Sequence, residues 1–197
     1  MRFVPRTIES LQLIVTDVEA ADMDRAKAMR ARRDARYGNI YASRDTDERW
    51  VGDLGEMCLD AWLEAEGIGH DWLAGDEASG MHDFTVAGWR MDAKAVKRKF
   101  EVRPGYTAQI TARHASEPVD GYFFMTFHTE TNAMWLLGAI GRQRFLGDAR
   151  YYGPDEWVHP NYQVRKGHEI YNIEIDRLTS PATWLEMVRA RPQQPAA

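Results

Sequence analysis

Cysteine is almost absent from this chain of 197 residues, and the single one, Cys58, has no partner for an internal disulfide. A zinc site built from several cysteines is excluded for the same reason, and a reducing, cytoplasmic compartment is expected. No run of about 18 apolar residues exists, so neither a transmembrane helix nor a membrane partner is expected. The first ten residues also lack the apolar core of a signal peptide.

Several catalytic motifs are missing as well. The sequence has no GxxxxGK[ST] loop for nucleotide phosphates and no GxSxG turn for a serine nucleophile. Its six histidines show no metal-ligand spacing such as H-x3-H. The net charge of −5 argues against a passive nucleic-acid coat protein, which is usually basic, but not against an enzyme whose carboxylates bind a metal.

The pattern of apolar residues predicts a mixed α/β domain. Two early helices are expected, an exposed one over 21–37 ending at Gly38 and an amphipathic one over 53–66. Two strands joined by a tight turn near Ala87 and Gly88 follow. Further strands and a terminal helix are expected over 106–111, 121–128, 134–141, 169–176 and 180–191. This order predicts one central mixed β-sheet flanked by helices, an α+β arrangement within the α/β class.

The stretch MDAKAVKRK, residues 91–99, places charged residues inside an apolar strand. Residues two apart in a strand point to the same face, so Asp92 and Lys94 are expected to project side by side while Met91 and Ala93 enter the core. Asp83 begins the preceding strand, and a hairpin brings it near Asp92. Carboxylates bind hard divalent ions such as Mg²⁺, and a neighbouring lysine can orient water or stabilise charge on a phosphate.

These residues resemble the signature of the PD-(D/E)XK nuclease superfamily, which has the restriction-endonuclease-like fold. The match consists of Asp83, eight intervening residues, and then Asp92-Ala93-Lys94, preceded by the helix GDLGEMCLDAWLEAEG. His82 stands where the superfamily's name has proline. The resemblance covers about residues 50–140.

The resemblance implies a role for each matching residue. It implies Mg²⁺, with Mn²⁺ able to substitute, bound by Asp83, Asp92 and the helix residue Glu56, with Lys94 positioning the attacking water. Gln109 and His82 are candidates for supporting roles. It further implies a DNA nuclease, an endonuclease in our interpretation, and a homodimer where both strands are cut. The alternative is a nuclease-fold module that binds nucleic acid or assembles without cleavage.

The basic run after the signature is the expected phosphate-binding surface, and it consists of Lys97, Arg98, Lys99 and Arg103. The chain, 1–197, is expected to form one domain. In this interpretation residues 50–140 form the nuclease-like core, 1–49 a helical N-terminal extension, 141–190 a C-terminal elaboration, and 191–197 a disordered tail.

Each candidate also has a purely structural interpretation. Asp53 and Glu56 match a capping box at a helix start, in which the glutamate bonds back to the cap backbone. Asp83 is also typical of a turn, and Asp92 with Lys94 of an ordinary salt bridge on a strand. His82 likewise fits a turn.

Overall fold

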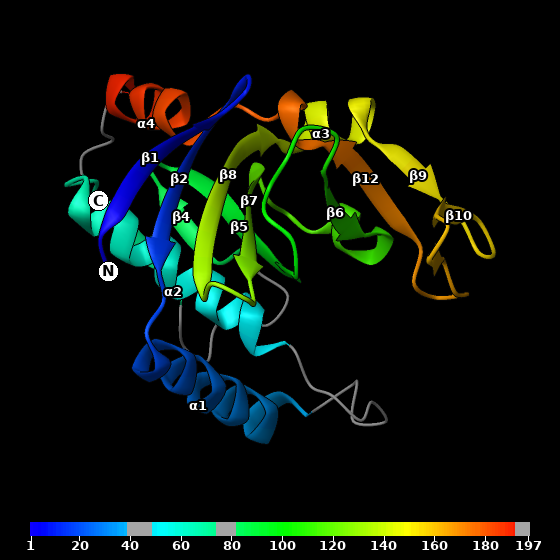
Figure 1. Cartoon of the computed structure of the whole chain (residues 1–197), viewed down its shortest axis with the longest axis horizontal. Coiled ribbons are helices and arrows are strands. Elements are labelled where there is room, and N and C mark those ends of the chain that lie inside the picture. Colours follow the sequence, from blue (N-terminus) through cyan, green and yellow to red (C-terminus); the bar gives the residue numbers. More distant parts are fainter. Residues whose placement is uncertain (39–48, 74–81, 192–197) are drawn as a thin grey trace.

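The main sheet of this computed structural model, which describes residues 1–38, 49–73 and 82–191, has seven strands in the order β1-β2-β8-β7-β5-β4-β3. Within it β5 and β7 run parallel and every other neighbouring pair is antiparallel (Figure 1). Its strands are β1 (Phe3–Ile8), β2 (Leu11–Asp17), β3 (His70–Trp72), β4 (Phe84–Val86), β5 (Trp89–Arg98), β7 (Gly121–His128) and β8 (Ala133–Gly141). The expected mixed α/β class, with a central mixed sheet, is therefore confirmed.

Two smaller sheets and the helices complete the fold. One small sheet has the order β6-β12-β9, from β6 (Thr107–Thr111), β12 (Ile170–Glu174) and β9 (Arg150–Tyr152), and the other pairs β10 (Trp157–His159) with β11 (Tyr162–Gln163). The α-helices are α1 (Ala20–Tyr37), α2 (Trp50–Ala65), α3 (Arg142–Asp148) and α4 (Pro181–Ala190). Two short 3₁₀ helices are η1 (Ala112–Ser116) and η2 (Ile175–Arg177).

Strand β7 lies in the middle of the sheet, and all eight of its residues are buried. Phe123 and Met125 contribute to the core beneath α2 and α4, where Trp62 and Trp184 stack at 6.2 Å. Tyr122, on the opposite face, contributes to a second core shared with β6, β12 and α3. The near-continuous apolar run of this strand follows from its being covered on both faces.

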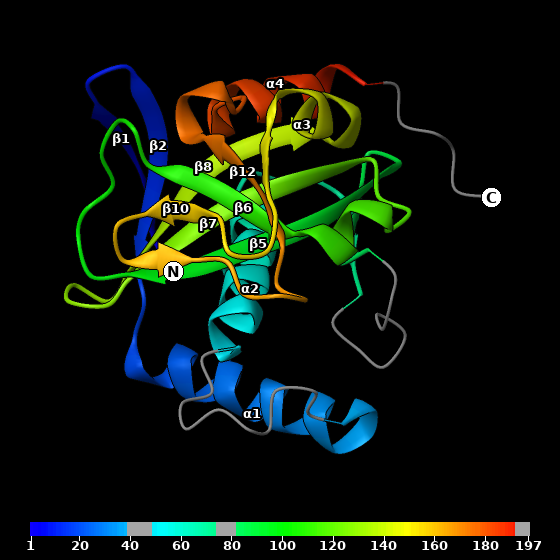
Figure 2. The same ribbon diagram turned by 90° about the vertical axis from the view of Figure 1, so that its right-hand side faces the viewer.

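Helix α2 lies directly on β5 because of one glycine. A Cβ atom at Gly55 would lie 2.5 Å from the Cβ of Ala95, closer than any normal carbon–carbon contact. The missing side chain lets the helix and strand backbones approach, and it fixes Glu56, the next residue on the helix, beside the β4–β5 hairpin. Helix α1 in turn packs on α2 at the end of the molecule away from α4 (Figures 1 and 2).

Most of the predicted elements are present. Helix α1 ends before Gly38, whose φ of 78° is left-handed, and the turn after β4 uses Ala87 and Gly88 at φ 48° and 76°. Helix α4 begins after Ser180, whose side chain accepts a hydrogen bond from the Thr183 amide. Among the described residues, no helix is both long and apolar enough to cross a membrane.

Two expectations need correction. Residues 1–49 were expected to be a helical extension, but β1 and β2 form a hairpin that widens the main sheet. Helix α2 begins at Trp50 and not at Asp53, and Asp53 is a buried residue of its first turn. After Gly141 the chain forms α3 and three short strands, β9, β10 and β11. The expected disordered tail lies outside the described residues, apart from Arg191.

Candidate functional site

The β4–β5 hairpin places Asp83 beside Asp92. Phe84 pairs with Met91, so the next residue pair outward joins these two aspartates. The Asp83 amide donates to the Met91 carbonyl at 3.1 Å, and Asp83 Oδ2 accepts a hydrogen bond from the Ala93 amide at 2.8 Å. Asp83 and Asp92 are therefore close together, as the sequence pattern predicts, because the turn at Ala87 and Gly88 sets the register of the hairpin.

Asp92 and Lys94 point to the same face of β5. Lys94 Nζ lies 2.6 Å from Asp92 Oδ2, and the Asp92 side chain is buried. Met91 and Ala93 point to the other face and belong to the core beneath α2. A lysine and a carboxylate are thus held together on a central strand, where neither depends on a loop for its position.

The electrostatics of this group raise the pKa of Asp83 and of Lys94. Burial, and then the negative charges of Glu56 and Asp92, raise the pKa of Asp83 well above its usual range. Burial disfavours the charge on Lys94, but Asp92 and Asp83 outweigh it and raise the pKa of the lysine. Lys94 is therefore a cation at neutral pH, suited to orienting water or stabilising negative charge.

Glu56 reaches this corner from α2, but its oxygens already have partners. Arg33 on α1 makes two hydrogen bonds to the Glu56 carboxylate, each of 2.7 Å, and Trp72 Nε1 donates a third at 3.1 Å. Arg33 also donates to the buried Asp53, which accepts another hydrogen bond from Arg30. Burial opposes the charge of Arg33, yet its hydrogen bond and attraction to Glu56 raise its pKa further.

This network excludes the capping interpretation of Asp53 and Glu56. The N-cap of α2 is Arg49, and no side chain caps the helix there. Burial raises the pKa of Asp53 even with Arg30 and Arg33 beside it, so its charge depends on those arginines. The two acidic residues bind α1 to α2 instead of capping the helix.

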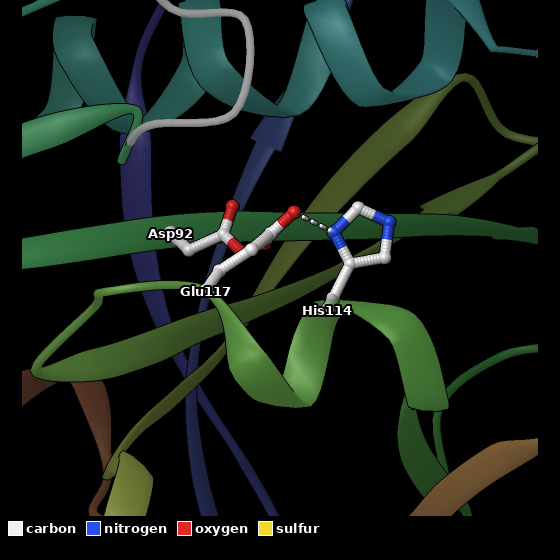
Figure 3. Close-up of side chains that lie close together, drawn as sticks. All are labelled: Asp92, His114 and Glu117. Atoms are coloured by element: carbon white, nitrogen blue, oxygen red, sulfur yellow. Dashed lines mark ion pairs between the residues drawn. The ribbon is translucent and has the colours of Figure 1, made fainter.

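Two residues that sequence analysis missed lie next to Asp92. His114 and Glu117, on η1 and just after it, bring ligand atoms within 4.8 Å of one another and of an Asp92 oxygen (Figure 3). His114 Nδ1 is 2.7 Å from Glu117 Oε1. The signal in the sequence is the spacing His-x-x-Glu, which puts both side chains on one face of a helical turn.

The turn that carries these residues is anchored from the opposite side. Arg142, at the start of α3, donates two hydrogen bonds to the Ala115 carbonyl, of 3.1 and 2.5 Å. The Arg142 amide donates to the Asp120 carbonyl, and the Asp120 amide donates to the Arg90 carbonyl. These two hydrogen bonds connect the segment that follows η1 to α3 and to β5. The turn that places His114 and Glu117 beside Asp92 is therefore held by hydrogen bonds to neighbouring elements.

The two expected supporting residues do not join this group. His82 Nε2 is paired with Thr85 Oγ1 at 2.9 Å, an arrangement that matches its interpretation as a turn residue. Burial lowers the pKa of His82, which is therefore neutral at physiological pH. Gln109 lies between Ala108 and Ile110 on β6, and because those neighbours enter the second core, Gln109 faces away from it.

The residues of the basic run differ in exposure. Lys97, Lys99 and Arg103 are exposed. Arg98 is half-buried, donates to the Thr107 carbonyl at 2.7 Å and stacks over the Tyr106 ring. Burial lowers the pKa of Arg98. Its guanidinium therefore connects β5 to β6, which leaves the exposed residues as the better candidates for contact with phosphate.

Comparison with known proteins gives a distant structural likeness. No family model matches the chain, and no curated protein sequence matches it. Among solved structures, a bacterial homing endonuclease, I-Ssp6803I, aligns at a TM-score of 0.37 and 14% sequence identity, over 74% of this chain and 94% of that one. A likeness this weak carries no argument about activity.

Proposed function

We propose that this chain is a metal-dependent deoxyribonuclease that hydrolyses phosphodiester bonds, acting as an endonuclease on DNA in the cytoplasm. The observation that carries the proposal is the pairing of Asp92 and Lys94 on a central strand, with Asp83 directly across the hairpin. Glu56 lies near these residues, burial opposes the charges of Asp83 and Lys94, and ionisable groups with perturbed pKa values are commonest at functional sites.

Each residue has a role consistent with its contacts. Asp83 and Asp92 supply the carboxylate oxygens that Mg²⁺ prefers, with Mn²⁺ as a substitute. When bound, such an ion polarises the scissile phosphate and makes water a better nucleophile. Lys94, a cation beside Asp92, orients the attacking water and stabilises charge on the phosphate. Glu56 supports the site from α2, where its bonds to Arg33 hold it beside Asp83.

The DNA backbone is expected to lie along the exposed residues of the basic run, Lys97, Lys99 and Arg103. Arg98 contributes by holding β6 against the end of β5. A homodimer fits a nuclease that cuts both strands of a duplex, because each subunit then supplies one active site.

One observation favours a second function, a nucleic-acid-binding or assembly module without cleavage. The Glu56 carboxylate is occupied by Arg33 and Trp72, and Asp83 Oδ2 by the Ala93 amide. A site with these acceptors already in use has fewer oxygens for an ion. Against it stands the retention of Asp92 with Lys94, since a buried ion pair contributes little to stability.

The two functions are separated by incubating the purified protein with linear, circular and branched DNA in Mg²⁺, Mn²⁺ or EDTA. A nuclease cuts in the divalent ions and not in EDTA, and Asp92→Ala and Lys94→Ala abolish cutting. Metal-dependent cutting that survives both substitutions would contradict the site. Tight DNA binding without cutting in any of these ions would support the binding module.

A further inference from the structure

His114 and Glu117 lie on η1 and just after it, and both face Asp92 (Figure 3). The proposed mechanism gives neither residue a role. We infer that Asp92, His114 and Glu117 together hold a divalent cation, and that the imidazole makes the site prefer a transition ion such as Mn²⁺ over Mg²⁺. A catalytic role for this cation rests on the proposed function. Binding of the cation itself does not depend on it.

The spacing of the three groups suits one ion. Their ligand atoms all lie within 4.8 Å of one another, and His114 Nδ1 is 2.7 Å from Glu117 Oε1. Ligands bound to a single small divalent ion at about 2.1 Å are separated by roughly 3 to 4 Å. Small side-chain rotations are therefore enough to place all three atoms around a common centre.

Two buried atoms of the group have a charged neighbour but no regular hydrogen bond. Asp92 is 3% exposed, and the described residues give neither its Oδ2 nor His114 Nδ1 a hydrogen bond. Their neighbours are charged groups instead: Lys94 Nζ lies 2.6 Å from Asp92 Oδ2, and Glu117 Oε1 lies 2.7 Å from His114 Nδ1. Buried polar atoms are rarely left in this condition, and a cation bound between them would satisfy both.

Asp83 and Glu56, the other carboxyl groups near Asp92, already accept hydrogen bonds. Asp83 Oδ2 accepts from the Ala93 amide, and the Glu56 oxygens are held by Arg33 and Trp72. His114 and Glu117, in contrast, have side chains 26% and 23% exposed. Three protein ligands with an open side leave coordination positions for water and a substrate phosphate, as in catalytic metal sites.

The donor set determines which cation is preferred. Carboxylate oxygens accept Mg²⁺ and Mn²⁺ alike, whereas an imidazole nitrogen favours transition ions over Mg²⁺. Arg142 holds the η1 turn through the Ala115 carbonyl, so the backbone that carries His114 and leads to Glu117 is positioned before an ion binds. His114 therefore determines the preference for Mn²⁺, and Asp92 and Glu117 supply the charge.

The test is titration of the purified full chain with Mn²⁺ in the absence of DNA, following the loss of the free-ion signal by electron paramagnetic resonance. Wild type is expected to bind one ion at this site. His114→Ala, Glu117→Gln and Asp92→Asn are each expected to weaken binding by about tenfold or more, as loss of a ligand or its support does. His159→Ala, which removes an exposed imidazole elsewhere, is the matched control and is expected to leave binding unchanged.

Competition with Mg²⁺ measures the role of the imidazole separately. Wild type should require a large excess of Mg²⁺ to release Mn²⁺, and that excess should shrink in His114→Ala. Mn²⁺ binding at the wild-type affinity in both His114→Ala and Glu117→Gln would overturn the inference, as would absence of Mn²⁺ binding by wild type. If the two substitutions do not change DNA cutting, the proposed nuclease function holds but this site is not part of it. If Mn²⁺ binds through His114 and no DNA is cut, the metal site holds and the nuclease function does not.

Discussion

Asp83 is a carboxyl group whose surroundings oppose its charge, and its pKa is raised by burial and by Glu56 and Asp92. The folded state therefore keeps this proton at pH values where the unfolded chain releases it, and the resulting stability declines as pH rises from about 4 through the folded pKa. Asp83→Asn removes that decline. The variant should be more stable than wild type at neutral pH, and the difference should vanish below about pH 4.

Urea unfolding at several pH values, with EDTA present, measures this difference. Asp71→Asn, at an exposed carboxylate on β3, is the matched control and should follow wild type at every pH. A difference between Asp83→Asn and wild type that stays constant from acid to neutral pH would show that Asp83 ionises normally.

Arg33 neutralises two buried carboxylates at once, Glu56 and the fully buried Asp53. Arg33→Met keeps much of the side-chain volume but leaves both acids without this partner, so we expect a loss of about 3 kcal/mol or more of the free energy of unfolding. Chemical denaturation measures it, with Arg32→Met at the exposed neighbouring position as the control. Equal stabilities of the two variants would show that Arg33 does not stabilise the fold through these carboxylates.

At this scale the sequence predicts contacts between near neighbours and misses the distant ones. Asp83, Asp92 and Lys94 were placed correctly because a two-residue turn and strand alternation determine their geometry. The partner of Glu56 was not foreseen, since Arg33 lies 23 residues upstream on another helix. His114 was overlooked because its ligand-type neighbour is a glutamate three residues on, not a second histidine.

At the scale of elements, the contact of α2 with β5 depends on Gly55. In Gly55→Ala the new Cβ would meet the Cβ of Ala95 at 2.5 Å, so α2 must move away, at a cost of roughly 1–3 kcal/mol. Gly52→Ala on the same helix meets nothing within 4 Å and should be neutral or slightly stabilising. Thermal unfolding of both variants checks the contrast, and similar midpoints would contradict the close packing.

The elements predicted best are those whose pattern is local. Strand β7 was predicted with its observed bounds because its apolar run and the glycine at its start are unambiguous. The β1–β2 hairpin was missed because β1 contains Pro5 and Arg6 and has mostly exposed or half-buried residues. Such an edge strand is stabilised by pairing with β2 and not by its own pattern, and single-sequence reasoning does not detect that pairing.

At the scale of the whole molecule, binding to DNA should depend on the exposed part of the basic run. Replacing Lys99 and Arg103 together by alanine should weaken binding and reduce the slope of log K against log salt by about 0.9 for each phosphate that the protein no longer neutralises. Arg98→Ala should instead lower stability, because Arg98 bonds to the Thr107 carbonyl. Fluorescence anisotropy at several salt concentrations measures the slope, and an unchanged slope in the double variant would place the DNA elsewhere.

The most direct test of the account concerns the carboxylate that both proposed arrangements share. Closed-circular DNA is incubated with Mn²⁺ and either wild type, Asp92→Asn or Asp71→Asn, after thermal unfolding has shown that all three fold. The account predicts cutting by wild type and by Asp71→Asn, none in EDTA, and a decrease of at least about a hundredfold in Asp92→Asn, as expected when a group that acts on the transition state is removed. Cutting by Asp92→Asn at the wild-type rate would contradict it.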